Sequence, residues 1–378
     1  MKYLTTLFLA LLSFSCNKIK LIRDITKEEV SFNKDQKLKF DVIDNRMISN
    51  VKINDKNFRM LVDFAAFSTI SDITLIKDFR KTKDNFYPQN HGLSADLQPL
   101  KNNILIADSV EAGFLSAKKI PFKVNLTKAP EFCKEQGQDG LLGENLFMQS
   151  ELPLLLDFEG NTISMIDKIP VGYHLIDSGF PITNRMVIYL KVFGKKEKFI
   201  FDTGFSGSIL LEKKYQKLMT KYDSINYKGF VFTATNTLIP SERTFYKNVD
   251  FELGKLNLKV NPMIADKVNL NLVGTKFLKN FNWIIDYDNK KIYFKDNLTY
   301  QKNAEDDLKK MEQEKFKFRA VDNKLICTSK KMTENSLKLG DEIISVNNIK
   351  VTPQNICEMQ NKLNETQDWD KLNLEIKK

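Results

Sequence analysis

The stretch Lys198-Phe199-Ile200-Phe201-Asp202-Thr203-Gly204-Phe205-Ser206-Gly207-Ser208-Ile209-Leu210-Leu211 consists of two apolar runs separated by a short polar segment. The apolar runs predict two buried strands, and the Gly and Ser residues between them predict a tight turn. Asp202 therefore lies at a strand end, beside backbone N–H groups and hydroxyls that favour the ionised form of a carboxyl group. A turn without any chemical role would look similar, because short motifs often occur by chance.

The segment from Ile200 to Ser206 resembles the active-site loop of the aspartic peptidases, in which two apolar residues precede Asp-Thr-Gly-x-Ser. In that family two such loops, one from each lobe or subunit, bring two aspartates together over one water molecule. The resemblance implies that Thr203 donates its hydroxyl across the lobe interface and that Gly204 offers its N–H to the carboxylate. It also implies that Ser206 holds the outer carboxylate oxygen, and that a second loop exists elsewhere in the chain.

An internal repeat supplies a candidate for the second loop. Asn45-Arg46-Met47 recurs as Asn184-Arg185-Met186, and at the same offset Met60-Leu61-Val62-Asp63 matches Phe199-Ile200-Phe201-Asp202. Asp63 thus falls opposite Asp202. A repeat of this length that occurs twice indicates a duplicated domain and not a solenoid.

Both copies contain short alternating strands with frequent turn residues, which predicts all-β lobes. Gly143 and Gly274 each follow an apolar pair and precede a short helical segment. In the aspartic peptidases such a glycine lets a strand pass close beneath the catalytic turn. The resemblance implies a bilobal double β-barrel, with a first lobe at 38–168 and a second lobe at 169–298.

The first loop departs from the family pattern. It reads Asp63-Phe64-Ala65-Ala66-Phe67-Ser68, so Phe64 replaces the Thr that would supply the interlobe hydroxyl. Ala65 replaces Gly, and its N–H reaches the carboxylate only if the turn accepts a Cβ there. Phe67 falls opposite Ser206, although Ser68 could serve if the turn is one residue longer. Asp63 is therefore either the second catalytic aspartate or a turn residue on a frame that has lost catalysis.

Composition argues against several other classes of function. The net charge is +10, but the lysines are spread along the chain, which predicts a basic surface and no nucleic-acid partner. Only His91 and His174 are present, and no CxxC pair occurs. We therefore expect no Ser-His-Asp triad, no metal site and no cofactor. A disulfide between Cys327 and Cys357 stays open at this point.

The N-terminus predicts export. Met1-Lys2 precedes an apolar run from Leu7 to Phe14, then Ser15 and Cys16, which is typical of a secretory signal at 1–15. The apolar run is too short for a membrane-spanning helix. Ser13-Phe14-Ser15-Cys16 resembles the lipobox of bacterial lipoproteins, which implies lipidation of Cys16, a tether at 16–37 and a place in the cell envelope, facing periplasm or exterior. The alternative is a plain signal peptide followed by an incidental cysteine.

A change of composition marks a C-terminal domain. A charged linker or short helix is expected at 299–315, and Leu337-Lys338-Leu339-Gly340-Asp341-Glu342-Ile343-Ile344-Ser345-Val346-Asn347 predicts a Gly-Asp turn that enters a buried strand. This stretch resembles PDZ domains, which implies a small PDZ-like α/β domain at 316–378 with a possible peptide ligand added to a sheet edge. An auxiliary packing role is the alternative.

Together these features predict an aspartic-type endopeptidase that hydrolyses extended peptides with Asp202 and Asp63. Two alternatives remain open. One is a catalytically inactive peptide-binding lipoprotein on the same fold, and the other is a membrane-tethered scaffold in which the PDZ-like domain carries the function.

Overall fold

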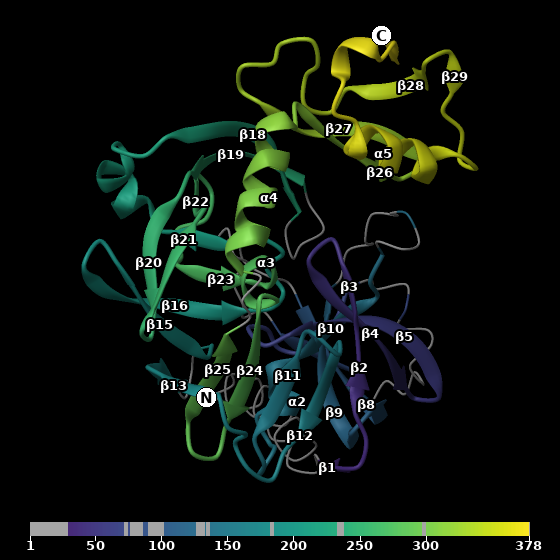
Figure 1. Ribbon diagram of the computed structural model, residues 1–378. Helices are drawn as coiled ribbons and strands as arrows, with labels where there is room; N and C mark the ends of the chain where they lie inside the picture. Colours follow the sequence, from purple (N-terminus) through teal and green to yellow (C-terminus); the bar gives the residue numbers. More distant parts are fainter. Residues whose placement is uncertain are drawn as a thin grey trace, which may run out of the picture.

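The computed structural model describes residues 29–71, 75, 86–89, 102–125, 133, 137–181, 185–232, 238–296 and 300–377. Strands dominate these residues and form three sheets, so the prediction of an all-β body is confirmed. Two lobes lie side by side, and a smaller C-terminal module (316–377) lies beyond them (Figure 1). The predicted signal and Cys16 lie outside the described residues.

The first lobe contains a closed barrel of six strands, in the order β4, β5, β10, β6, β9 and β8, because β8 also pairs with β9. A short helix, α2, follows β10 directly. The elements of this lobe are β1 (Glu29–Phe32), β3 (Asp41–Ile43), β4 (Arg46–Ile53), β5 (Lys56–Asp63), β6 (Thr69–Ile70), β7 (Phe86–Gln89), β8 (Asn102–Ala112), β9 (Leu115–Asn125), β10 (Gly140–Gly143) and α2 (Glu144–Phe147).

The start of the first lobe differs from the prediction of a tether at 16–37. Residues 29–32 form β1, which pairs antiparallel with β9 from Glu29 opposite Lys118 to Phe32 opposite Leu115. The cause is local, since Val30 and Phe32 alternate with polar neighbours and pack against the core. The part of the expected tether that the structure describes therefore belongs to the sheet.

The second lobe repeats the strand order of the first. β15 pairs with β16, β16 runs parallel to β23, and β23 pairs with β17, as do the matching strands β4, β5, β10 and β6. Its elements are β14 (Ser178–Gly179), β15 (Val187–Val192), β16 (Lys195–Asp202), β17 (Ile209–Leu211), the 3₁₀ helix η3 (Lys213–Met219), β18 (Ser224–Phe232), β19 (Leu238–Tyr246), β20 (Val249–Leu253), β21 (Leu256–Val260), β22 (Met263–Ala265), β23 (Leu272–Gly274) and α3 (Thr275–Leu278).

The hairpins that lead to the two aspartates have matching tight turns. Asn54 and Asp55 join β4 to β5 with φ angles of 46° and 67°, and Phe193 and Gly194 join β15 to β16 with 52° and 74°. Two successive residues with positive φ are typical of the type I′ turn, whose twist fits that of paired strands. Asn54 also accepts hydrogen bonds from two backbone N–H groups of β8. These turns fix the register of β5 and β16, and therefore where each strand ends.

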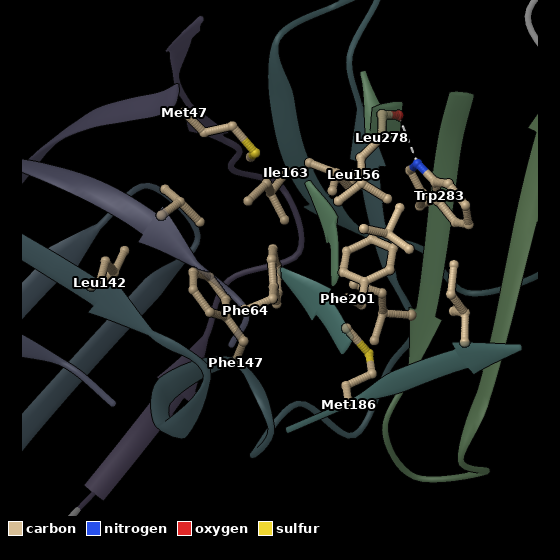
Figure 2. Packing of buried hydrophobic residues seen from close by; sticks show 14 of the residues in the cluster. Met47, Phe64, Leu142, Phe147, Leu156, Ile163, Met186, Phe201, Leu278 and Trp283 are labelled. Carbon is tan, nitrogen blue, oxygen red and sulfur yellow. Dashed lines mark hydrogen bonds between the residues drawn. The ribbon is translucent and has the colours of Figure 1, made fainter. Parts of the chain in front are cut away.

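A third sheet joins the lobes. The hairpin β11–β12 from the first lobe and the hairpin β24–β25 from the second meet where β11 pairs with β24, with Leu156 opposite Trp283. The strands of this sheet are β2 (Leu38–Lys39), β11 (Leu154–Asp157), β12 (Thr162–Met165), β13 (His174–Ile176), β24 (Phe281–Asp286) and β25 (Lys291–Asp296). One continuous apolar cluster spans both lobes, with Phe64, Phe201 and Trp283 near its centre (Figure 2).

The predicted linker at 299–315 is a helix that packs on the second lobe. Helix α4 (Tyr300–Gln313) runs along this lobe toward the C-terminal module (Figure 1). Lys276 forms an ion pair with Asp307 at 3.1 Å, and the Tyr227 hydroxyl donates to the Met311 carbonyl at 2.6 Å. Because the hydroxyl reaches one of the last carbonyls of α4, which have no partner within the helix, it stabilises this end.

The C-terminal module continues a sheet of the second lobe. Its strand β27 pairs antiparallel with β18, from Tyr227 opposite Lys331 to Gly229 opposite Ser329. Its other elements pack around a small core of their own. The elements are β26 (Phe316–Val321), β27 (Lys324–Lys331), β28 (Glu342–Val346), β29 (Ile349–Lys350), α5 (Ile356–Glu365), the 3₁₀ helix η4 (Trp369–Lys371) and β30 (Leu374–Ile376).

Candidate active site

Asp63 and Asp202 occupy matching places in the two lobes. Asp63 is the last residue of β5 and lies opposite Gly143 of the parallel strand β10, while Asp202 ends β16 opposite Gly274 of β23. A Cβ on Gly143 would lie 2.3 Å from the backbone nitrogen of Ser68, and one on Gly274 would lie 2.3 Å from the Gly207 carbonyl oxygen. Each glycine therefore lets the loop after its aspartate cross the neighbouring strand.

Gly204 lies between the two carboxyl groups. Its N–H donates to Asp202 Oδ1 at 3.0 Å. A Cβ added to Gly204 would lie 2.2 Å from Asp63 Oδ2. The same residue thus touches both side chains, so the structure brings the two predicted aspartates together at the interface between the lobes.

Thr203 links the two loops across this interface. Its buried hydroxyl donates to the Val62 carbonyl at 2.9 Å and accepts from the N–H of Phe64 at 2.9 Å. Phe64 has no hydroxyl, so among the described residues the first loop sends no matching side-chain hydrogen bond to the second loop. Its ring is fully buried and packs 4.9 Å from the ring of Phe147 and 6.5 Å from that of Phe201 (Figure 2). Apolar packing therefore takes the place of the second hydroxyl.

Backbone N–H groups support the two carboxyl groups unequally. Asp202 Oδ1 accepts from Gly204 and from Phe205, both at 3.0 Å. Asp63 Oδ1 accepts from Ala65 at 2.8 Å, so the turn does accept the Cβ of Ala65. Asp202 is half-buried, whereas Asp63 is only 7 % exposed. Asp202 is therefore the better solvated and better supported of the two.

The two serines considered for the carboxyl groups have other places. Ser206 is exposed, and its hydroxyl has no hydrogen-bond partner among the described residues. The second donor to Asp202 is instead the N–H of Phe205. Ser68 is buried, donates to Asn145 Oδ1 at 2.9 Å and accepts from the Gly143 N–H at 3.0 Å. Ser68 therefore fixes the loop to the strand beneath it and does not contact the carboxyl group.

Burial raises the pKa of both aspartates. Burial raises the pKa of Asp63 to about 7, and the neighbouring charge of Asp202 adds to the rise. Burial also raises the pKa of Asp202, although the positive charge of Arg185 and the N–H groups of Phe205 and Gly204 act to lower it. Two carboxyl groups this close titrate as a pair that shares a proton.

Two charged residues beside the pair were not predicted from the sequence. The positive charge of Arg185 lowers the pKa of both aspartates. Glu144 is the first residue of α2 and raises the pKa of Asp63. Arg185 stood in the repeated Asn-Arg-Met triplet, and Glu144 differs from Thr275 at the matching place after the glycine. That difference between the two copies is the sequence feature that could have identified Glu144 as a site residue.

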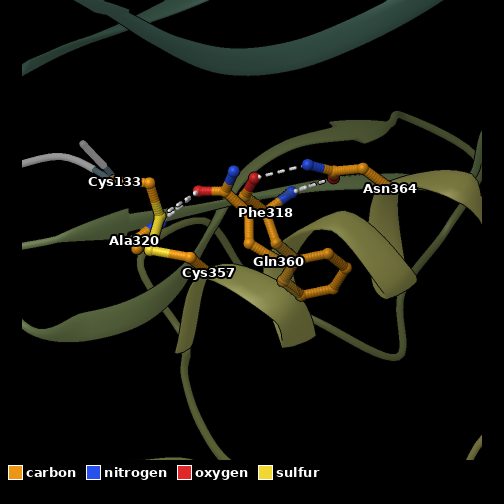
Figure 3. Close-up of a disulfide and its surroundings, with 6 residues drawn as sticks. All are labelled: Cys133, Phe318, Ala320, Cys357, Gln360 and Asn364. Atoms are coloured by element: carbon orange, nitrogen blue, oxygen red, sulfur yellow. Dashed lines mark hydrogen bonds between the residues drawn. A yellow bond between two sulfur atoms is a disulfide. The ribbon is translucent and has the colours of Figure 1, made fainter. Parts of the chain in front are cut away.

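Part of the edge of β26, an edge strand of the C-terminal module, is bonded to helix α5. On the side of β26 that faces α5, Asn364 accepts from the N–H of Phe318 and donates to its carbonyl, both at 2.9 Å. Gln360 accepts from the N–H of Ala320 at 2.7 Å (Figure 3). Side chains of α5 therefore satisfy several backbone groups that a strand added to β26 would use.

A disulfide joins the first lobe to the module. Cys133 pairs with Cys357 of α5, with Cα atoms 5.7 Å apart (Figure 3). Cys327, which the sequence left open as a partner of Cys357, is a free thiol buried in the module core. The module thus contacts the second lobe through β27 and is covalently attached to the first.

Within the described part of the chain, no group of three or more His, Cys, Asp or Glu side chains is placed to hold a metal ion. No helix among the same residues is long and apolar enough to cross a membrane. A comparison with models of known protein families and with curated proteins finds no match.

Proposed function

We propose that the protein is an aspartic-type endopeptidase with the bilobal fold of that family. A water molecule between Asp63 and Asp202 would attack a peptide carbonyl of a substrate held between the lobes. The ionised carboxyl takes a proton from this water, and the protonated carboxyl donates to the carbonyl oxygen. Asp202 accepts two N–H bonds and Asp63 accepts one, which supports Asp202 as the ionised partner and Asp63 as the protonated one.

The observation that carries the proposal is the position of Gly204. It donates to one carboxyl group, and a Cβ added to it would overlap the other, at the ends of two equivalent strands. Two buried carboxyl groups that meet across the lobes, with the pKa of Asp63 raised to about 7, form the arrangement that a shared proton requires. Perturbed pKa values of this kind are enriched at functional sites.

The test is cleavage of a mixed peptide library from pH 3 to 8 by the chain without its predicted signal. We expect cleavage by the wild type and a loss of roughly 100-fold or more in Asp202→Asn and in Asp63→Asn, because each removes one partner in proton transfer. A wild type that cuts nothing at any pH, or variants that cut equally well, would remove the proposal.

A second candidate function is peptide binding without hydrolysis on the same frame. The observation that favours it is Phe64, which takes the place of the second interlobe hydroxyl and leaves Asp63 with a single N–H donor. Calorimetric titration of library peptides that are not cut separates the two functions. Binding that is lost in Gly204→Ala would support the second candidate, because the added Cβ obstructs the space beside Asp63.

For the C-terminal module we propose a PDZ-like fold with a packing role. The Asn364 and Gln360 contacts to β26 support this role over capture of a peptide by strand addition, and so does the pairing of β27 with β18. A scaffold function carried by this domain has less support for the same reason. Deletion of 316–378 would test the choice, since a packing role predicts an unstable body and a scaffold predicts a stable one.

We also propose export and lipid attachment at Cys16. The disulfide between Cys133 and Cys357 supports an oxidising compartment, where such bonds persist. Incorporation of a labelled fatty acid into the wild type, and its loss in Cys16→Ser, is the expected result. Equal incorporation in both would contradict the lipid anchor.

A further inference from the structure

Glu144 is fixed to the loop that carries Asp63. Its N–H donates to the Ala66 carbonyl at 2.9 Å, and the preceding Gly143 lies opposite Asp63 in the parallel pair β5–β10. The side chain of Glu144 is half-buried and therefore does not extend freely into solvent. Any movement of this residue is coupled to the loop by these backbone contacts.

The matching residue of the second lobe behaves differently. Thr275 makes the same backbone contact, donating its N–H to the Phe205 carbonyl at 2.8 Å. Its hydroxyl then stays within its own lobe and donates to the Thr203 carbonyl at 2.8 Å. The same backbone position thus carries a short neutral side chain in one lobe and a carboxyl group in the other.

The carboxyl group of Glu144 reaches across the interface between the lobes. The Tyr287 hydroxyl, in the turn between β24 and β25, donates to Glu144 Oε1 over 3.5 Å, and the N–H of Met186 donates to the same carboxyl group. Burial and the charge of Glu144 raise the pKa of Tyr287 well above its usual value, so the phenol keeps its proton and remains a donor. Both donors belong to the second lobe.

Arg185 is the charged neighbour of this carboxyl group. It directly precedes Met186, and its positive charge acts on Glu144 as well as on Asp63 and Asp202. The other cation nearby is Lys123 of β9, whose ammonium lies 5.3 Å from the centre of the Phe67 ring and whose pKa is lowered by burial and by Arg185. The groups that act on or contact the Glu144 carboxyl are therefore Tyr287, Met186 and Arg185, and Glu144 acts in turn on Asp63.

We propose that Glu144 is a positioning residue for the aspartate pair: held by the Tyr287 hydroxyl and the Met186 N–H, its carboxyl group offsets the charge of Arg185 at the two aspartates. This inference rests on the proposed function in assigning the pair a working pH range. Burial raises the pKa of Glu144 itself to about 7, so Glu144 ionises over the same pH range as Asp63. Once ionised, it weakens the effect of Arg185 and adds a negative charge near Asp63. Both effects keep the shared proton on the pair to higher pH.

The variant that tests the proposal is Glu144→Gln, which keeps the shape of the side chain and removes its charge. Because Glu144 is only partly ionised near pH 7, we expect the midpoint of Asp63 protonation to fall from about 7 by up to roughly half a unit. The alkaline limb of the peptide-cleavage profile should fall by the same amount. Glu151→Gln is the control, because it removes an exposed negative charge from the same lobe and should leave both quantities unchanged.

The midpoint is measured by carbon-13 NMR of aspartate-labelled full-length protein, with Asp63→Asn to assign the signal. A shift in Glu144→Gln without peptide cleavage by any form would support the positioning role and contradict the hydrolytic function. Cleavage with an unmoved midpoint and pH profile would overturn the positioning role alone. Should Glu144→Gln not fold, Tyr287→Phe replaces it: the lost donor raises the pKa of Glu144, so a smaller shift in the same direction is expected, and no shift would overturn the proposal.

Discussion

The loop after β16 and the loop after β5 end equivalent strands and cross equivalent glycines, but they hold their carboxyl groups by different means. The second loop supplies two N–H donors to Asp202 and sends the Thr203 hydroxyl into the first lobe. The first loop supplies one N–H donor to Asp63 and fills the matching space with the ring of Phe64. A duplicated site can therefore keep the position of its reactive group while polar support is replaced by packing on one side.

The contrast also shows which loop organises the other. Thr203 donates to the carbonyl before Asp63 and accepts from the N–H after it, so the second loop holds both sides of the first aspartate. No side-chain contact of this kind runs in the opposite direction between the described loop residues. Damage to the second loop should therefore disturb both carboxyl groups, whereas damage to the first should act mainly through stability.

The largest effect is expected from Gly204→Ala. The new Cβ would lie 2.2 Å from Asp63 Oδ2, so the two carboxyl groups must move apart. We expect peptide cleavage to fall by roughly 100-fold or more, as displacements near 1 Å commonly do. Ala65→Gly at the matching place of the first loop is the comparison, and its loss should be far smaller because the N–H stays in place. Equal losses of peptide cleavage in the two variants would contradict the proposed difference between the two loops.

An intermediate effect on stability should separate packing from polar support. Phe64→Thr introduces the residue that the second loop has at the matching position 203 but removes a fully buried ring, which should lower the free energy of unfolding by about 3–5 kcal/mol. Thr203→Val should cost about 1–3 kcal/mol, because it leaves the Val62 carbonyl and the Phe64 N–H without a partner. Urea denaturation measures both. A stabilising Phe64→Thr would mean that the ring does not support the interface.

A smaller effect should appear in the dependence of stability on pH. The pKa of Asp63 is about 7 in the folded protein and about 4 in an unfolded chain, so the folded state binds the proton more tightly. Its contribution to stability is present below about pH 4 and is lost as the pH rises to about 7, with a slope of at most about 1.4 kcal/mol per pH unit. The difference in unfolding free energy between wild type and Asp63→Asn should therefore decrease over this range. A constant difference would show that Asp63 has an ordinary pKa.

The features that the sequence predicted are those encoded locally and repeated. Asp63 opposite Asp202, and Gly143 and Gly274 beneath them, followed from two aligned copies of one pattern, because strand register is set by nearby turns. The all-β class followed from the alternation of short strands. The pairing of β1 with β9 was missed because its four residues resemble a polar tether.

Other features depend on contacts between distant parts of the chain, and no local pattern announces them. Cys133 and Cys357 are 224 positions apart, and their pairing depends on where the module lies relative to the first lobe. Asn364 and Gln360 read as ordinary polar helix residues until their contacts with β26 are known. Glu144 was not predicted, because the two copies of the repeat point to a site through the residues that they share, and position 144 differs from its counterpart Thr275.

The bond between Cys133 and Cys357 closes a covalent ring that contains the entire second lobe and helix α4. In a chain-entropy picture, a ring of this length limits the unfolded state by about 5 kcal/mol. The ring also changes the outcome of a proteolytic cut. One broken peptide bond anywhere between these cysteines leaves a single covalent molecule with both aspartates attached, so a nicked protein would keep its mass until it is reduced. If the protein is the peptidase that we propose, this topology would keep its two aspartates in one molecule after a cut by another copy of itself.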